Sequence, residues 1–235
     1  MSGSLFLVGV GTGDPELLTL KAVRILSEVK IIAYGQKPNT PSFSLEIARE
    51  YLREDAQFLP IDIPMKVERE PAQNAYDILV KTMLKYLEQG ENVVYLCEGD
   101  PLFYGSAMYL IARIKKEINV EIISGITSVA ASSAAIKRPL CARNEIFKVL
   151  PAPLEDKVIL DELKTAQAVA IIKVGRHFMR IKSLLEKSGH AENAMIIENA
   201  SGADERITLL NDYSKNELPY FASILCYKGD EAWGK

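Results

Sequence analysis

The sequence has few cysteines and histidines, and they do not form the patterns that metal sites or disulfides use. Its three cysteines, Cys97, Cys141 and Cys226, include no CxxC pair, and the two histidines are His177 and His190. Structural zinc sites and disulfide frameworks need more of these residues, at closer spacing. We therefore expect no metal site and no disulfide, and we expect the protein to lie in the reducing cytoplasm.

Long hydrophobic runs are also missing. The first apolar stretch, Leu5 to Val10, is too short for the core of a signal peptide, and Met1 to Ser4 contains no basic residue. Nowhere does the chain reach the roughly 20 consecutive apolar residues that a membrane helix requires. The sequence therefore predicts neither a leader nor a membrane partner.

Neither sign of charge dominates the chain. Its 235 residues include 28 Lys and Arg against 31 Asp and Glu, which gives a formal net charge of −3. Proteins that hold nucleic acid through its phosphates usually present a basic surface, so we expect no nucleic-acid partner. The 48% of hydrophobic and 25% of charged residues are typical of a folded globular protein. The length allows one large domain or two small ones.

Short apolar runs alternate with helical patterns in the first half of the chain. Such alternation predicts a mainly parallel sheet that helices cover on both faces. Ligands of these sheets lie beyond the carboxyl ends of the strands. The predicted strands are residues 5–10, 30–34, 56–60, 92–97 and 120–123, and the clearest predicted helices are residues 16–29 and 72–89.

The pattern changes after residue 123. A stretch rich in Ala and Ser leads through several prolines into further strands, so we predict two α/β domains, residues 1–123 and 124–235. The second is the more basic, with a net charge of +1 against −4 for the first. Its predicted strands are residues 168–174, 194–198, 206–210 and 221–227.

The first loop of interest, Gly9 to Pro15, follows the first strand. A dinucleotide-binding GxGxxG pattern that starts at Gly9 would need glycine where Asp14 stands, and no acidic residue ends the second strand. These departures disfavour a nicotinamide oxidoreductase. Asp14 and Pro15 instead predict the N-cap and first residue of a helix.

Two further loops, residues 98–106 and 124–128, follow the fourth and fifth strands. In a parallel sheet they share an edge with the first loop. Main-chain groups, a carboxylate and a phenol in loop 98–106 suit a ligand with ribose hydroxyls and an amine. Plain turns that begin a helix are the simpler interpretation of each loop taken alone.

Together these three loops resemble those of the tetrapyrrole methylases, which use S-adenosylmethionine. The resemblance implies a two-domain class III methyltransferase fold, with a mainly parallel sheet in the N-terminal domain and a mixed sheet in the C-terminal domain. It further implies a homodimer, a cofactor cleft between the domains, a tetrapyrrole substrate and no required metal. Outside the loops it covers residues 17–22, 173–176, 198–201 and 219–221.

The resemblance also assigns cofactor contacts residue by residue. Two of them, Val174 and Ala200, stand where other members often have methionine and glycine. The implied cofactor-binding residues are Pro15, Gly99, Asp100, Pro101, Tyr104, Thr127, Ser128, Val174 and Ala200.

Within the family, the resemblance implies methylation of C20 of precorrin-2, or of cobalt-factor II in the anaerobic pathway. After methyl transfer a proton leaves C20, and Glu98, Asp100 and Tyr104 are the candidates for a base. Asp100 is equally suited to capping a helix, so no base is assigned. A sensor that binds without turnover stays an alternative. The acidic net charge disfavours the RNA-methylating branch.

The many carboxylates of such a substrate call for fixed cations, and arginine matches a carboxylate in bidentate fashion. A helix over residues 176–187 would place Arg176, Arg180 and Lys187 on one face, although a solvated helix face has the same spacing. The candidates for binding the substrate carboxylates are Arg138, Arg143, Lys173, Arg176 and Arg180.

Overall fold

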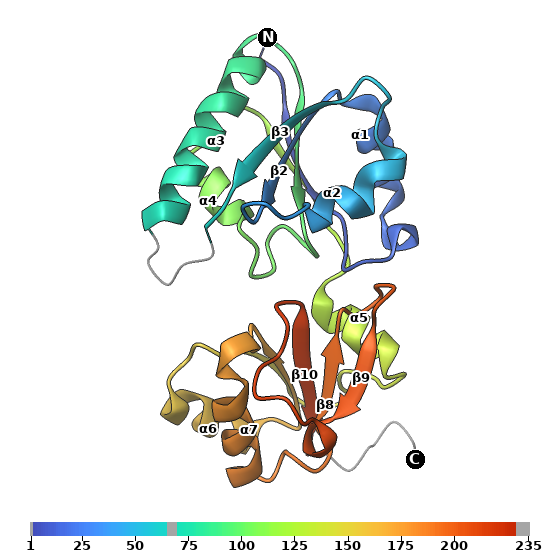
Figure 1. Cartoon of the computed structure of the whole chain (residues 1–235), viewed down its shortest axis with the longest axis vertical. Coiled ribbons are helices and arrows are strands. Elements are labelled where there is room, and N and C mark those ends of the chain that lie inside the picture. The colour runs from blue at the N-terminus through green and yellow to red at the C-terminus, as the bar shows by residue number, and fades with distance from the viewer. Residues whose placement is uncertain (1, 65–69, 229–235) are drawn as a thin grey trace. The chain divides into compact units, whose positions relative to one another are not determined.

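The computed structural model describes residues 2–64 and 70–228. The chain divides between Thr127 and Ser128 into two compact units, and each unit has its own five-stranded sheet (Figure 1). No helix in the described ranges is both long and apolar enough to cross a membrane.

The sheet of the N-terminal unit has the order β3-β2-β4-β1-β5, and every neighbouring pair is parallel. All five predicted strands are present. Since the strands run the same way, their carboxyl ends meet at one edge, as in other parallel sheets. The strands are β1 (Leu5–Gly9), β2 (Ile31–Gln36), β3 (Gln57–Asp62), β4 (Val93–Cys97) and β5 (Val120–Ile123).

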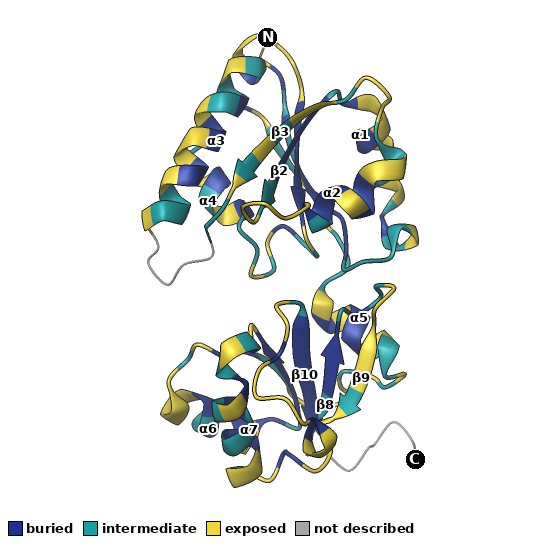
Figure 2. Cartoon of the chain, viewed as in Figure 1, coloured by how far each residue is buried: buried dark blue, intermediate teal, exposed yellow. Residues whose placement is uncertain are grey.

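Helices cover both faces of this sheet, and each face has its own hydrophobic cluster (Figure 2). On one face, Tyr76 and Met83 of α3 (Glu70–Glu88) lie in a cluster with Leu110 of α4 (Ala107–Ile111). On the other face, Leu26 of α1 (Leu20–Glu28) clusters with Leu45 of α2 (Phe43–Ala48). Burial on both faces explains why the central strands are apolar throughout.

The predicted helix over residues 16–29 is not continuous, so that prediction was wrong. A 3₁₀ turn, η1 (Pro15–Leu17), comes first, and the backbone is extended at Leu18 (ψ 137°). Helix α1 then starts afresh, because Thr19 acts as a second N-cap whose Oγ1 accepts from Ala22 N at 3.2 Å. Helix α2 and the 3₁₀ turn η2 (Arg49–Tyr51) are too short to have shown a helical period.

The sheet of the C-terminal unit has the order β6-β7-β10-β8-β9 and is mixed. Strands β6 and β7 are parallel, and β10 is antiparallel to both β7 and β8. The carboxyl ends of β6, β7 and β8 therefore share one edge with the start of β10. The strands are β6 (Phe147–Pro151), β7 (Ala168–Ile172), β8 (Met195–Glu198), β9 (Arg206–Leu209) and β10 (Ala222–Tyr227).

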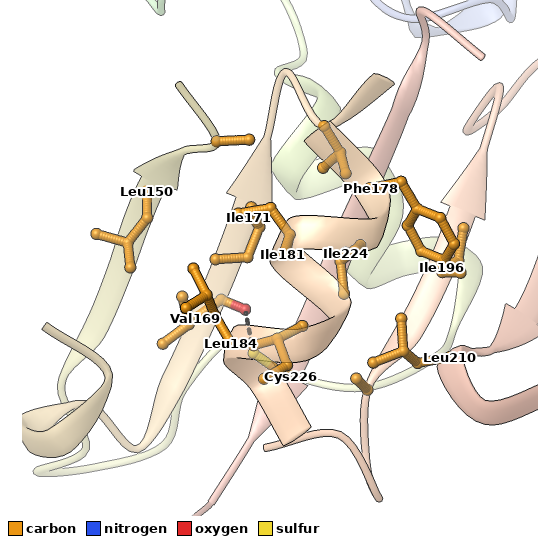
Figure 3. Close-up of a cluster of buried hydrophobic side chains, with 14 of the residues drawn as sticks. Leu150, Val169, Ile171, Phe178, Ile181, Leu184, Ile196, Leu210, Ile224 and Cys226 are labelled. Atoms are coloured by element: carbon orange, nitrogen blue, oxygen red, sulfur yellow. Dashed lines mark hydrogen bonds between the residues drawn. The ribbon is translucent and has the colours of Figure 1, made fainter. Parts of the chain in front are cut away.

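Helices α6 (Asp156–Thr165) and α7 (Phe178–Lys187) cover one face of this sheet. Phe178 and Ile224 lie in the resulting core, where the Cys226 thiol donates to Val169 O at 3.6 Å (Figure 3). Helix α5 (Ser128–Ala135) packs on the opposite face, where the hydroxyls of Ser132 and Ser223 are 2.8 Å apart. A short 3₁₀ turn, η4 (Leu210–Asp212), follows β9.

The predicted helix over residues 176–187 also begins later than expected. Arg176 lies in a 3₁₀ turn, η3 (Gly175–His177), and the α-helix starts only at Phe178. Arg176 therefore does not share a regular helical face with Arg180 and Lys187. The buried Phe178 accounts for this start, since it anchors the first turn of α7 in the core.

Candidate active site

The three loops of interest follow three adjacent strands of the N-terminal sheet, β4, β1 and β5. The predicted common edge is therefore confirmed. Main-chain hydrogen bonds join the first two loops, because Gly99 N donates to Gly11 O at 2.7 Å and Gly11 N donates to Gly99 O at 3.3 Å. Both glycines have positive φ, 77° and 65°, which only glycine adopts without strain.

Glycine also allows the third loop to touch the other two. A Cβ at Gly125 would lie 2.1 Å from Gly99 O, and one at Gly9 would lie 2.7 Å from Gly125 N. Real Cβ atoms do not approach main-chain atoms so closely, so Gly9 and Gly125 both depend on the missing side chain, whereas Gly99 depends on glycine for its positive φ. The loops thus form one interlocked main-chain surface, which we call the glycine junction: Gly9, Gly99 and Gly125.

Asp100 braces this junction from the second loop. Its Oδ1 accepts from Leu102 N at 2.9 Å, and its Oδ2 accepts from Gly125 N at 3.1 Å. Both carboxylate oxygens therefore hold main-chain N–H groups. This side chain shapes its own turn and ties the second loop to the third.

The other predicted residues of the N-terminal unit lie at or near this edge and differ in their exposure. Tyr104 is 41% exposed, and its backbone has a positive φ of 56°, which is uncommon for a non-glycine residue. Pro15 follows Asp14, whose Oδ1 accepts from Glu16 N at 2.9 Å, so the predicted N-cap is confirmed. Pro101 is buried, while Thr127 is half-buried.

The second loop carries an exposed carboxylate above buried neutral groups. Glu98 reaches solvent, yet protein atoms surround it, and this desolvation raises the pKa of its carboxyl above the ordinary value. Beneath it, burial raises the pKa of the Cys97 thiol and of the Tyr95 phenol well above their usual ranges. The Tyr95 hydroxyl lies 3.5 Å from Ser106 Oγ. The local surroundings thus disfavour further negative charge.

In the C-terminal unit, two predicted residues lie at the edge formed by the ends of β7 and β8. Val174 and Ala200 are both buried, and Val174 belongs to the hydrophobic core. Their neighbours Lys173 and Asn199 have positive φ, 56° and 49°. Asn199 N donates to Phe221 O at 2.7 Å, which ties this loop to the start of β10. Backbone strain of this kind often gathers at functional sites.

The five predicted cations do not gather at one place. Lys173 and Arg176 are exposed at the edge just described. Arg180 already has partners, because Nη1 lies 2.5 Å from Asp156 Oδ1 and 3.1 Å from Leu154 O, and Nη2 donates to Ala152 O. These bonds hold α7 to the loop after β6.

Arg138 and Arg143 lie at the other edge of the same sheet. The Arg138 guanidinium carbon is 3.6 Å from the centroid of the Tyr227 ring, at the far end of β10. Arg143 is exposed in the loop that leads into β6, with φ 46°. Within the C-terminal unit, neither is brought to Lys173 and Arg176.

Sequence reasoning treated Glu198 only as part of a motif, and the structure shows why it is unusual. The residue is 5% exposed, and its Oε1 accepts from the Tyr213 hydroxyl at 3.2 Å. Within the described part of the chain, buried Oε2 has no hydrogen-bond partner. The sequence pattern that could have pointed to Glu198 is a carboxylate at the end of the apolar run of β8. Among residues 2–64 and 70–228, no three His, Cys, Asp or Glu side chains gather as a metal site would require.

Comparison with known proteins identifies the class. The family model of the Tetrapyrrole (Corrin/Porphyrin) Methylases matches residues 4–211. The chain belongs to this family, as the loops led us to expect.

Several relatives within this family have named activities. Over 231 residues the chain is 32% identical to a precorrin-2 C(20)-methyltransferase of a Sinorhizobium species, covering 95% of this chain and 94% of the relative. A cobalt-precorrin-2 C(20)-methyltransferase of Salmonella typhimurium is 29% identical, with 97% and 98% covered. The cobalamin biosynthesis protein CobIJ of Mycobacterium bovis is 35% identical over 94% of this chain. The chain spans only 45% of that longer relative, about half its length.

Solved structures show the same fold. A cobalt precorrin-4 methyltransferase, CbiF, matches with a TM-score of 0.75 at 22% identity, covering 95% of this chain and 94% of the other. The uroporphyrin-III C-methyl transferase of Thermus thermophilus, solved with S-adenosyl homocysteine, matches with a TM-score of 0.65 at 22% identity. It covers 96% of this chain and 98% of that one. The predicted fold class, a class III methyltransferase with a parallel and a mixed sheet, is confirmed.

Proposed function

We propose that the protein transfers a methyl group from S-adenosylmethionine to C20 of precorrin-2, giving precorrin-3A, in cobalamin biosynthesis. The observation that carries this proposal is the similarity to the Sinorhizobium C(20)-methyltransferase over nearly the whole of both chains. The second candidate substrate is the cobalt-bearing counterpart, which the similarity to the Salmonella enzyme favours. We further propose a homodimer in the cytoplasm.

The edge of the N-terminal sheet fits such a methyl donor. Where a Cβ would lie at Gly11 the nearest atom is Leu17 Cβ at 4.0 Å, and at Gly99 it is Ile126 O at 3.7 Å. A ligand can therefore approach the main chain at both glycines. Carbonyl oxygens there can accept from an amine and from ribose hydroxyls, while N–H groups can donate to a carboxylate.

We propose donor-binding residues for each unit separately. In the N-terminal unit they are Pro15, Tyr104, Thr127 and the turn formed by Gly99, Asp100 and Pro101, and in the C-terminal unit they are Ser128, Val174 and Ala200. Because Val174 points into the core, its contribution is through the main chain of the strained loop. The short side chain of Ala200 keeps its loop accessible in the same way.

The chain's contribution to catalysis is mainly positioning. The bound donor supplies a methyl group on a positively charged sulfur. The glycine junction and Asp100 hold the loops rigid, so that the nucleophilic carbon and the methyl group meet at roughly 3 to 3.5 Å.

For the substrate carboxylates we propose Lys173 and Arg176, which are both exposed at one edge. Arg180 is left out because its guanidinium is held by Asp156 and two carbonyl groups. A single charge-assisted hydrogen bond contributes about 1.5–3 kcal/mol, enough to matter for substrate affinity.

The test is an anaerobic incubation of the purified protein with S-adenosylmethionine and either precorrin-2 or its cobalt complex. We expect a gain of one methyl group, and an isotopically labelled methyl located at C20 of the metal-free substrate. Preference for the cobalt complex would favour the second candidate. If both ligands bind without any transfer, the protein is a sensor and the enzymatic proposal fails. Light scattering of the purified protein tests the homodimer.

A further inference from the structure

We propose that the carboxylate of Glu98 is the base that removes the proton from C20 after methyl transfer. This inference rests on the proposed function and assigns a catalytic residue within it. The three candidates, Glu98, Asp100 and Tyr104, all lie in the loop after β4, and their surroundings distinguish them.

Asp100 is not available for this role. Each of its carboxylate oxygens accepts a main-chain N–H, from Leu102 and from Gly125. Protonation by substrate would remove the negative charge that strengthens both of these bonds, and so would loosen the junction of the loops. Asp100 is therefore a positioning residue.

Tyr104 is also poorly suited to the task. A phenol must lose its own proton before it can accept another, whereas a carboxylate is ionised at neutral pH. The positive φ of 56° sets the direction in which this exposed ring projects, a feature that suits ligand contact.

Glu98 combines access with reactivity. It is exposed at the edge of the sheet, and no other side chain within residues 2–64 and 70–228 pairs with its carboxylate. Desolvation raises the pKa of this carboxyl and outweighs a hydrogen bond from the residue's own main chain, which lowers it, so the carboxylate is a stronger base than one in water. Its titratable neighbours are Cys97 and Tyr95 of β4 and Tyr76 of α3, all of which interact electrostatically with it, together with Asp100 in its own loop. Burial keeps the first three neutral, so they do not compete for the proton.

The proton balance of the step is complete. As the bond between the methyl carbon and C20 forms, the bond from that methyl to sulfur breaks, and its electron pair stays on sulfur. The macrocycle then carries the positive charge. The C20–H bond breaks next, its electron pair returns to the macrocycle, and the proton goes to a Glu98 carboxylate oxygen. Because Glu98 is exposed, it passes this proton to water.

The experiment separates the two bond changes in the Glu98→Gln variant. Precorrin-2 that carries tritium at C20 is incubated with S-adenosylmethionine that carries a ¹⁴C-methyl group, and methyl transfer and tritium release are measured together. We expect tritium release to slow by about 100-fold, the usual contribution of a general base, and to lag behind methyl transfer. Added formate supplies a carboxylate to the variant, so it should restore part of the rate of tritium release.

Two readouts do not depend on turnover. Calorimetry with S-adenosylhomocysteine should give the same affinity for wild type and Glu98→Gln, since the side chain is not assigned to the donor. Carbon-13 NMR of the glutamate carboxyls should show one group with a raised pKa that disappears in the variant. The control is Glu91→Gln, an exposed carboxylate before the other end of β4, which should change nothing.

The outcomes keep the two proposals apart. If wild type methylates C20 and Glu98→Gln releases tritium at the wild-type rate, Glu98 is not the base. If the variant instead loses affinity for S-adenosylhomocysteine while transfer and release stay matched, Glu98 is a donor contact and the inference is overturned. If wild type transfers no methyl group at all, the proposed function itself fails.

Discussion

Gly9 and Gly125 lie so close together that neither position has room for a side chain. A Cβ built on Gly125 would be 2.9 Å from Gly9 Cα, and one built on Gly9 would be 2.8 Å from Gly125 Cα. The carboxyl ends of β1 and β5 thus meet through bare main chain. The shape of the candidate active site depends on this contact, and it can be tested by adding a methyl group.

The substitution Gly125→Ala should destabilise the protein and disorder the loop junction. Its new Cβ would overlap main-chain atoms of Gly99 and Gly9, which cannot move aside as a side chain can. Overpacking of this kind costs about 1–3 kcal/mol, measured as a lower midpoint of denaturant unfolding. Calorimetry should also show weaker binding of S-adenosylhomocysteine. The control Gly189→Ala has positive φ but no atom within 4 Å, so it should lose stability yet keep the ligand affinity.

Replacement of Asp100 by Asn should leave one main-chain N–H without its acceptor. An amide offers one oxygen where the carboxylate offers two, so either Leu102 N or Gly125 N loses its bond. We expect a loss of about 1–2 kcal/mol in unfolding free energy and a weaker affinity for S-adenosylhomocysteine. The exposed Asp204→Asn serves as the control. Wild-type affinity in Asp100→Asn would contradict the role of a brace.

Arg176 and Arg180 form a matched pair of basic residues with different expected roles. Arg176→Ala should raise KM for the tetrapyrrole by about tenfold, the equivalent of 1.4 kcal/mol, with little effect on stability. Arg180→Ala should lower the stability and leave KM nearly unchanged, since it removes the bonds from α7 to Asp156, Ala152 and Leu154. Steady-state kinetics and thermal unfolding of both variants check this. An unchanged KM in Arg176→Ala would remove it from the substrate site.

His190 should make stability depend on pH. Burial and the charge of Lys228 lower the pKa of its ring below the ordinary value of 6.5, so the folded state prefers the neutral form. The unfolded chain takes up a proton first as the pH falls. The contribution to stability is therefore complete above pH 6.5 and declines as the pH falls below it.

The measurement is the urea midpoint between pH 5 and pH 8 in wild type and in His190→Asn. We expect a shallower dependence on pH in the variant below the ordinary histidine pKa. His177 contributes in the same direction, because burial also lowers its pKa, so the comparison uses the difference between the two proteins. Proton NMR of the two histidines in a second variant, Lys228→Gln, identifies the group responsible. The pKa of His190 should rise when the charge of Lys228 is removed.

Much of the architecture could be predicted from local patterns. Apolar runs bounded by Gly, Pro or polar residues marked every strand of the N-terminal sheet, because buried strands need apolar side chains on both faces. The cap at Asp14 was predictable for the same local reason, since a carboxylate followed by Pro15 suits the start of a helical turn. The break at Leu18 could not be predicted. The apolar residues keep a helical spacing through this point, although Thr19 acts as a second N-cap.

The sequence by itself determined the strands of the N-terminal sheet, the order of the three loops and the resemblance to a methylase family, because these depend on neighbours along the chain, whereas strand β6 was not predicted. Only the tertiary structure decided which polar groups already have partners within the protein. Asp100 binds Gly125, Arg180 binds Asp156, and Arg138 lies over the ring of Tyr227. These partners lie far apart in sequence. They meet because the order of the strands places their loops together, and no periodicity in the chain encodes that order.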